Sequence, residues 1–273
     1  MRSVSVLMAL LAPSAVQAAT LYVGPSRTYT EIQDAIDAAS SGDTIQVDAG
    51  TYTEELDITT NLTVQSASGS SRTDITGSGT VVTITGTATS PVSVSFEGFT
   101  LTSTSSEGRG VDVRYATVDI GDVEINGFDN DTPGAGIRIR RDSDVAITDS
   151  VFSNNDVGSE NGGHVYISDG TLSIEDSTLW DGYATIGGAI YAEDAEVVVD
   201  GCDFDGNEAE GSGYYTYGYG GAIGISGGSL ELSDSTFTAN LVETRGYGGH
   251  LAAWETSIEI TGTDFSEGAA VYG

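Results

Sequence analysis

The feature that most constrains the fold of this chain is a repeat that runs through its middle and end. Each copy contains a short segment that ends in Leu, Ile or Phe, and the final residues of successive segments are 24, 27, 27, 25, 33 and 28 residues apart. A second short segment begins with Gly in every copy, and the length varies in the loop before it. Such spacings indicate a repeat architecture in which each copy is one structural unit. The final residues are Leu101, Ile125, Phe152, Leu179, Phe204, Phe237 and Phe265.

Within a copy, apolar and polar residues alternate over short segments that Gly, Asp, Asn and Ser separate. No copy has room for a helix, so each one must be a single turn of strands. Turns stacked about 4.8 Å apart give a parallel β-helix, an all-β solenoid. In the copy at 220–240 we expect alternate apolar residues to point inward, where the turns above and below bury them. These residues are Ile223, Ile225, Leu230, Leu232 and Phe237.

Two polar positions of the repeat are also expected inside the solenoid. Asn155, Asn207 and Asn240 each stand three residues after the Phe of their turn, which suits a ladder of inward-facing amides. The single cysteine, Cys202, occupies a position that is serine in other copies, so we interpret it as a small buried residue rather than a reactive thiol. Those serines are Ser150, Ser177 and Ser235.

Residues 1–18 have the pattern of a secretory signal peptide. Arg2 precedes an apolar run that ends at Ala12, and small residues lead to a cleavage site after Ala18. The run is shorter than the roughly 20 residues that a bilayer span needs, and no cysteine follows it to take a lipid. We therefore expect a soluble product that is secreted or lies at the cell surface or outer membrane of a bacterium.

The remainder divides into a cap with the first coils, residues 19–64, and β-helix rungs, residues 65–273. A predicted helix near the start of the first segment would cover the open first rung. The chain stops at "GAAVYG", partway through a rung, so we expect the last rung to fray or to associate end to end. The apolar face of the predicted helix holds Ile32, Ala35, Ile36 and Ala39.

The net charge of the sequence limits the classes of molecule that we expect it to bind. The sequence has nine basic residues, all of them arginine, against 41 acidic ones, and its net charge is −32. Nucleic acids and anionic membranes are bound through basic side chains, so neither is an expected partner.

Two sets of motifs resemble known families. The segment "YTEIQDAIDAASSGDTIQVDAGTYTEELDI" is similar to the N-terminal cap and first coil of secreted β-helix proteins of the pectin-lyase fold, among them pectinesterases and lyases. The motifs "FSNN", "FDGN", "FTAN" and "GGAI" resemble the repeats of the polymorphic outer membrane protein family. These resemblances imply a single-stranded right-handed parallel β-helix. The second one implies an adhesive surface passenger that precedes a membrane barrel, and we find no anchoring barrel in this sequence.

A carbohydrate-active enzyme is the alternative function, because the fold often hosts such enzymes. The catalytic patterns of pectinesterases and polygalacturonases do not occur here in their settings. The best candidate for a calcium-dependent polysaccharide lyase is a basic spot in which Arg114 and Arg140 stack on adjacent rungs, with Arg141 beside them. We favour a structural interpretation, in which Arg138 pairs with Asp112, and we assign no catalytic residue. The other arginines would be balanced by Asp119, Asp142 and Asp144.

No metal site and no cofactor are expected. His164 and His250 occupy one repeat position three rungs apart, roughly 14 Å at the usual strand spacing, so they cannot share an ion. The acidic loops "GFDNDTPG" and "DFDGNEAEG" offer oxygen ligands for weak calcium binding, but neither is an EF-hand. We interpret them as solvated acidic turns.

The longest loop indicates a binding surface. The insertion "EGSGYYTYGYGG" carries Tyr215, Tyr217 and Tyr219, and Trp254 falls on the next rung. Rings with an apolar face and a polar tip suit a sugar or a protein surface, so we predict that these four residues bind a glycan or protein ligand. The sequence therefore predicts a secreted or cell-surface structural or adhesin-type module without catalytic activity.

Overall fold

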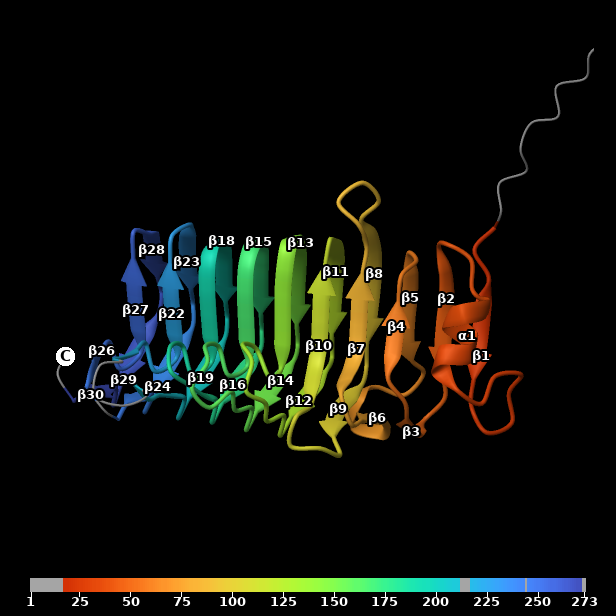
Figure 1. Ribbon diagram of the computed structural model, residues 1–273, viewed down its shortest axis with the longest axis horizontal. Coiled ribbons are helices and arrows are strands. Elements are labelled where there is room, and N and C mark those ends of the chain that lie inside the picture. The colour runs from red at the N-terminus through yellow and green to blue at the C-terminus, as the bar shows by residue number, and fades with distance from the viewer. Residues whose placement is uncertain (1–16, 212–216, 244, 272–273) are drawn as a thin grey trace, which may run out of the picture.

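The computed structural model describes residues 17–211, 217–243 and 245–271. They form a right-handed parallel β-solenoid whose turns lie side by side along one axis (Figure 1). This confirms the predicted fold class. The predicted signal peptide, residues 1–18, falls almost entirely outside the described residues, and so does the predicted site residue Tyr215.

Three stacks of strands make up the wall of the solenoid, and we number them in the order in which each turn visits them. The first stack contains β4 (Leu56–Ile58), β7 (Thr80–Thr85), β10 (Arg109–Arg114), the beginnings of β13 (Ile137–Thr148), β15 (Val165–Glu175) and β18 (Ile190–Asp200), and then β22 (Ile223–Ser226) and β27 (Leu251–Trp254). The second stack contains β1 (Thr20–Val23), β2 (Asp43–Val47), β5 (Leu62–Ser66), β8 (Val92–Glu97), β11 (Ala116–Gly121), the ends of β13, β15 and β18, β23 (Ser229–Ser233) and β28 (Ser257–Thr261).

The third stack is a separate nine-stranded sheet made of β3 (Gly50–Thr53), β6 (Thr73–Gly77), β9 (Thr100–Ser103), β12 (Glu124–Asn126), β14 (Val151–Ser153), β16 (Thr178–Trp180), β19 (Asp203–Asp205), β24 (Thr236–Thr238) and β29 (Asp264–Ser266). Between the third stack and the next turn lie short strands in two small sheets, β17 (Tyr183–Ala184), β20 (Glu208–Ala209), β25 (Leu241–Val242) and β30 (Ala269–Ala270), and β21 (Gly218–Tyr219) with β26 (Gly246–Tyr247). All of these strand pairs are parallel.

The core consists of like side chains stacked from turn to turn. Phe204 and Phe237 are register partners on β19 and β24, and their rings stack with centroids 4.4 Å apart. Leu230 and Leu232 of β23 are buried above Val197 and Val199 of β18. The inward register predicted for residues 220–240 is therefore confirmed, because the turns on both sides cover this turn with apolar atoms.

The polar ladders are also confirmed. Asn207 is fully buried, accepts a hydrogen bond from the Gly182 amide at 3.0 Å and donates one to the Leu179 carbonyl at 2.9 Å, so its amide joins two turns. Cys202 is buried in the serine position, where its own amide donates to Ser235 Oγ at 3.0 Å. Burial raises the pKa of the Cys202 thiol to about 11, which agrees with a packing role rather than a nucleophilic one.

The first turn is covered as predicted. Helix α1 (Ile32–Ala38) buries Ile32, Ala35 and Ile36 against β1, β2 and β4, at the end of the solenoid shown in red in Figure 1. Its first amides, those of Ile32 and Gln33, donate to the two carboxylate oxygens of Glu54 at 2.9 Å, which caps the helix with a side chain from the next coil. A short 3₁₀ helix, η1 (Ser70–Arg72), follows. No helix in the described ranges has the length and apolar character of a membrane span.

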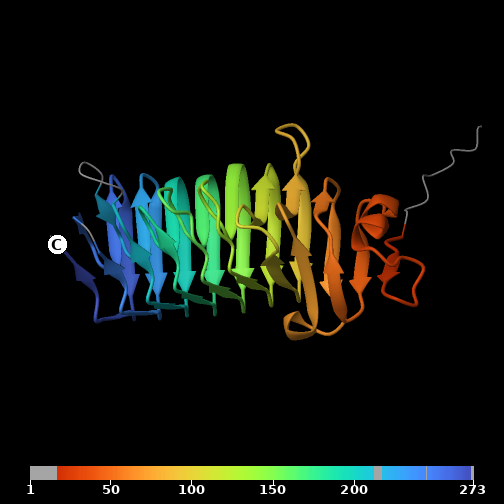
Figure 2. The same ribbon diagram turned by 60° about the horizontal axis from the view of Figure 1, so that its bottom comes forward.

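The Gly-Gly pairs return the chain from the loops to the first stack. Gly187 has a φ of 62°, and a Cβ there would lie 2.0 Å from the Ile190 carbonyl oxygen. At Gly188 a Cβ would lie 2.4 Å from the Glu208 carbonyl oxygen. Only glycine fits at both positions, which explains why the pair recurs although the loops before it differ in length. Figure 2 shows these loops along one side of the regular stacks.

Candidate functional site

The outward face of the first stack gathers most of the charged and aromatic residues that the sequence singles out. Because Val111 and Val113 of β10 point into the core, Asp112 and Arg114 between and beyond them point outward. Because register partners lie side by side on neighbouring strands, the outward residues form two rows that run from turn to turn. One row contains Asp112, Arg138, Tyr166 and Tyr191, and the other contains Arg114, Arg140, Ser168, Glu193, Ser226 and Trp254.

Three arginines converge on one carboxylate at one end of these rows. Asp112 accepts hydrogen bonds from Arg138 Nε at 2.7 Å, from Arg140 Nη2 at 3.2 Å and from Arg114. The predicted pairing of Arg138 with Asp112 is therefore correct. The predicted balance of Arg114 and Arg140 by other aspartates is wrong, because both guanidinium groups reach the same carboxylate.

The electrostatics of this group follow from its burial. Asp112 is only 2% exposed. Burial acts to raise the pKa of Asp112, but the hydrogen bond and charge of Arg138, with Arg140, outweigh it and leave the pKa below its usual value. Burial, followed by the charge of Arg138, lowers the pKa of Arg109 to about 10. Asp112 is thus an ionised carboxylate whose acceptor sites are taken.

Arg109, on the same strand as Asp112, has a structural role. Its Nε donates to the Gly134 carbonyl at 2.7 Å, and Nη2 donates to the Pro133 carbonyl at 3.0 Å. These bonds hold the loop that precedes β13 against the first stack. Asp119 and Asp144, which the sequence suggested as arginine partners, instead line a hollow of about 270 Å³ on the second stack.

Aromatic rings occupy the other end of the face. Tyr219 of β21 contacts Trp254 edge to face with centroids 5.0 Å apart, and it stacks on Tyr247 of β26 at 5.9 Å. Tyr217 lies 6.3 Å from both Tyr219 and Tyr247. Tyr217 and Tyr247 are exposed, so this set of four residues, which we call the aromatic cluster, presents ring surface to solvent.

The structure brings three of the four predicted binding residues together, namely Tyr217, Tyr219 and Trp254. The prediction missed the contact of Tyr166 with Tyr191, whose centroids are 5.9 Å apart between the arginines and the aromatic cluster. The recurrence of Tyr three residues after a Gly-Gly pair in adjacent repeats was the available signal.

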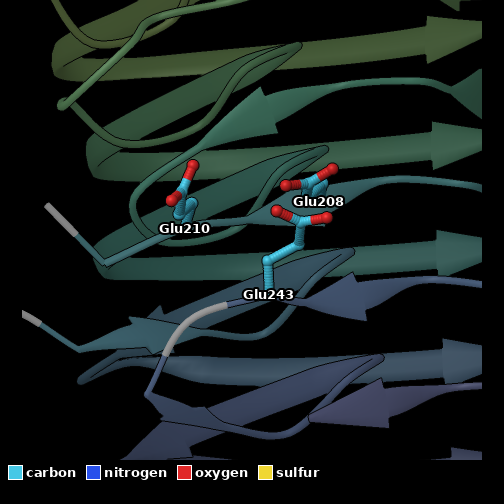
Figure 3. Close-up of side chains that lie close together, drawn as sticks. All are labelled: Glu208, Glu210 and Glu243. Atoms are coloured by element: carbon cyan, nitrogen blue, oxygen red, sulfur yellow. The ribbon is translucent and has the colours of Figure 1, made fainter. Parts of the chain in front are cut away.

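A group of carboxylates lies on the side of the loops. Glu208, Glu210 and Glu243 offer oxygens within 4.8 Å of one another, and Figure 3 shows the carboxylates of Glu208 and Glu243 side by side. Burial, and then the charges of Glu243 and Glu210, raises the pKa of Glu208 to about 7. Such a group can share protons or hold a cation. Two members come from the loop "DFDGNEAEG", and Glu243 comes from the next turn.

The histidines do not form a joint site. His164 is fully buried, its Nδ1 lies 2.9 Å from Asn155 Nδ2, and its ring packs on Phe152. His250 makes the corresponding contact with Asn240 at 3.1 Å. Both side chains extend the asparagine ladder.

Comparison with known proteins identifies the architecture. The family described as "Right handed beta helix region" matches residues 80–265. A pectin methyl esterase of the rice weevil has a similar solved structure, with a TM-score of 0.53, 15% identity, and coverage of 96% of this chain and 92% of that one. The structure of ORF18 of Geobacillus virus E2 is also similar, with a TM-score of 0.53 and 16% identity. The match covers 86% of this chain and 57% of the viral protein.

A pectin methylesterase from Erwinia chrysanthemi is similar at 12% identity, with a TM-score of 0.47 over 93% of this chain and 91% of that one. Among curated protein sequences, none matches. At these identities the structural likeness establishes the pectin-lyase-like fold alone.

Proposed function

This chain belongs to the right-handed beta helix family, and from that premise we propose that it is a secreted or cell-surface module of adhesin type that binds a glycan without catalysis. The observation that carries the proposal is the aromatic cluster. Tyr217 and Tyr219 come from one turn, and Tyr247 and Trp254 come from the next. The centroids of the rings in contact lie 5.0 to 6.3 Å apart. Rigid aromatic rings lose little conformational entropy on binding, and their faces suit the apolar face of a sugar.

The alternative, a polysaccharide lyase or related carbohydrate-active enzyme, draws on the convergence of Asp112 with arginines on the same face. A general base must be within reach of a substrate proton and must have a free acceptor site. Asp112 has neither property, because it is buried and accepts bonds from three arginines. Asp112 is therefore not a candidate general base, and the preference for binding rests on the aromatic cluster.

The experiment is a glycan array followed by calorimetry with the best ligand. Replacement of Tyr217, Tyr247 and Trp254 together by Ala is expected to weaken binding by tenfold or more, since buried aromatic anchors carry most of the energy of an interface. The control is Tyr22→Ala with Trp180→Ala, which removes exposed rings elsewhere. The proposal fails if the parent binds no glycan, if the cluster variant binds as well as the control, or if the bound glycan is cleaved.

A further inference from the structure

We propose that Arg114, Arg138 and Arg140 form a subsite for one oxyanion of the ligand, a carboxylate or a sulfate ester, so that the glycan bound along the first stack is acidic. This inference rests on the proposed glycan binding and names the chemistry of the ligand. It starts from an imbalance: three positive charges face one negative charge, and no other carboxylate in the described part of the chain forms an ion pair with them.

This local excess of positive charge contrasts with the acidic composition of the whole chain. The chain carries nine arginines and a net charge of −32, yet five of the arginines fall between residues 109 and 141. Burial, despite the attraction of Asp112, lowers the pKa of Arg140, which means that this cation is held at a cost. A single arginine would suffice to neutralise Asp112, so the fold alone does not account for the other two.

The hydrogen bonds of the group are also incomplete. The Nε atoms of Arg114 and Arg140 are buried and have no partner. A buried donor without a partner costs free energy, and such costs are retained where a site serves binding. The role of Asp112 is to position the three guanidinium groups side by side.

The guanidinium groups remain accessible to a ligand. The side chains of Arg114 and Arg140 are 41% and 28% exposed, whereas Asp112 is closed off beneath them. Each guanidinium has five N–H donors in a planar fork. The ion pair of each arginine with Asp112 is made through one nitrogen. The outward donors match the geometry of a carboxylate or sulfate.

The subsite lies in line with the aromatic residues. Arg140 and Trp254 occupy the same outward row, four strand steps apart, which is roughly 19 Å at the usual strand spacing. Tyr166 and Tyr191 lie between them. Glu193, exposed in the same row, would repel a second anion, so the charged group of the ligand is placed at the arginine end.

The test compares three forms of one tetrasaccharide: with uronate carboxylates, with these reduced to alcohols, and with sulfate esters added to the reduced form. Affinities are measured for the parent, for Arg114→Gln with Arg140→Gln, and for Arg72→Gln, an exposed arginine outside the site. Arg138 is kept because it holds Asp112. Thermal melting confirms that the variants fold.

The proposal expects the parent to bind an acidic form at least tenfold more tightly than the neutral form, with an advantage that declines as salt rises. The double variant should lose that advantage and keep its affinity for the neutral form. Whichever acidic form binds better identifies the oxyanion. Equal binding of neutral and acidic forms would overturn the inference and leave glycan binding intact, whereas no binding of any form would overturn both. Equal binding of an acidic peptide would show that the subsite does not read a glycan.

Discussion

The interior turns and the last described turn carry similar apolar residues at corresponding positions, yet the environments of these residues differ. Phe237 of β24 and Phe265 of β29 are register partners, but Phe237 is fully buried and Phe265 is 44% exposed. Leu232 and Ile260 show the same contrast, at 0% and 42% exposure. A turn therefore does not bury its own apolar side chains, because burial comes from the turn stacked on it.

The other end of the solenoid shows what removes this exposure. There Ile32 and Ala35 of α1 are fully buried against the first strands, and Glu54 satisfies the amides at the helix start. The same physical requirement, a cover for the open turn, is met by a helix at one end and is unmet in the described residues at the other.

The largest expected effect is a difference between two identical substitutions. Phe237→Ala should destabilise the fold by about 3 to 5 kcal/mol, because it removes a ring packed between Phe204 and Phe265. Phe265→Ala should cost less than about 2 kcal/mol, because much of that ring already contacts water. Denaturant unfolding of the two variants measures both values, and equal losses would show that the last turn is covered in solution.

A smaller effect is expected from the two histidines. Burial lowers the pKa of His164 to about 3, whereas an unfolded histidine titrates near 6.5. Between these values only the unfolded chain takes up the proton, so stability falls as the pH drops below 6.5, by about 2 kcal/mol over the first one and a half pH units.

The pKa of half-buried His250 is lowered for the same reason, burial, so His250 should give a shallower dependence in the same direction. Unfolding free energies from pH 5 to 7 for the parent, His164→Ala and His250→Ala test this, since alanine fills that position in other turns. A His164→Ala curve parallel to that of the parent would contradict the prediction.

The smallest effect concerns association. We expect the exposed turn to pair with a second copy at high salt, where the repulsion due to a net charge of −32 is screened. Ile258→Ser with Ile260→Ser should weaken this pairing about tenfold, and Val198→Ser, at an exposed interior position, should not. Sedimentation velocity at rising salt measures it, and a parent that stays monomeric throughout would rule it out.

The sequence predicted the fold in detail because the repeat carries register information. Once Phe204 and Phe237 are aligned, strand alternation and the asparagine ladder follow from geometry alone. The aromatic cluster was predicted from loop composition, and three of its residues meet as expected.

The sequence did not reveal which of several possible partners an arginine side chain contacts. Arg114 and Arg140 each had several aspartates within reach, and only packing decided that both contact Asp112. The sequence indicated the acidic loop that holds Glu208 and Glu210, but the approach of Glu243 to this loop was missed for a related reason. Glu243 joins Glu208 from the next turn across loops of unequal length, and repeat spacing does not align such residues.

The Gly-Gly pairs have a consequence for how such a chain changes over generations. Because the pair at Gly187 and Gly188 restores the path of the backbone whatever precedes it, the loop before each pair is free of the constraints that the core imposes. An insertion there, such as the tyrosine-rich one, changes the surface of the loop without altering the scaffold. Duplication of a whole turn lengthens the outward face of the solenoid by one strand spacing. The loop surface and the fold can therefore change independently of each other during evolution.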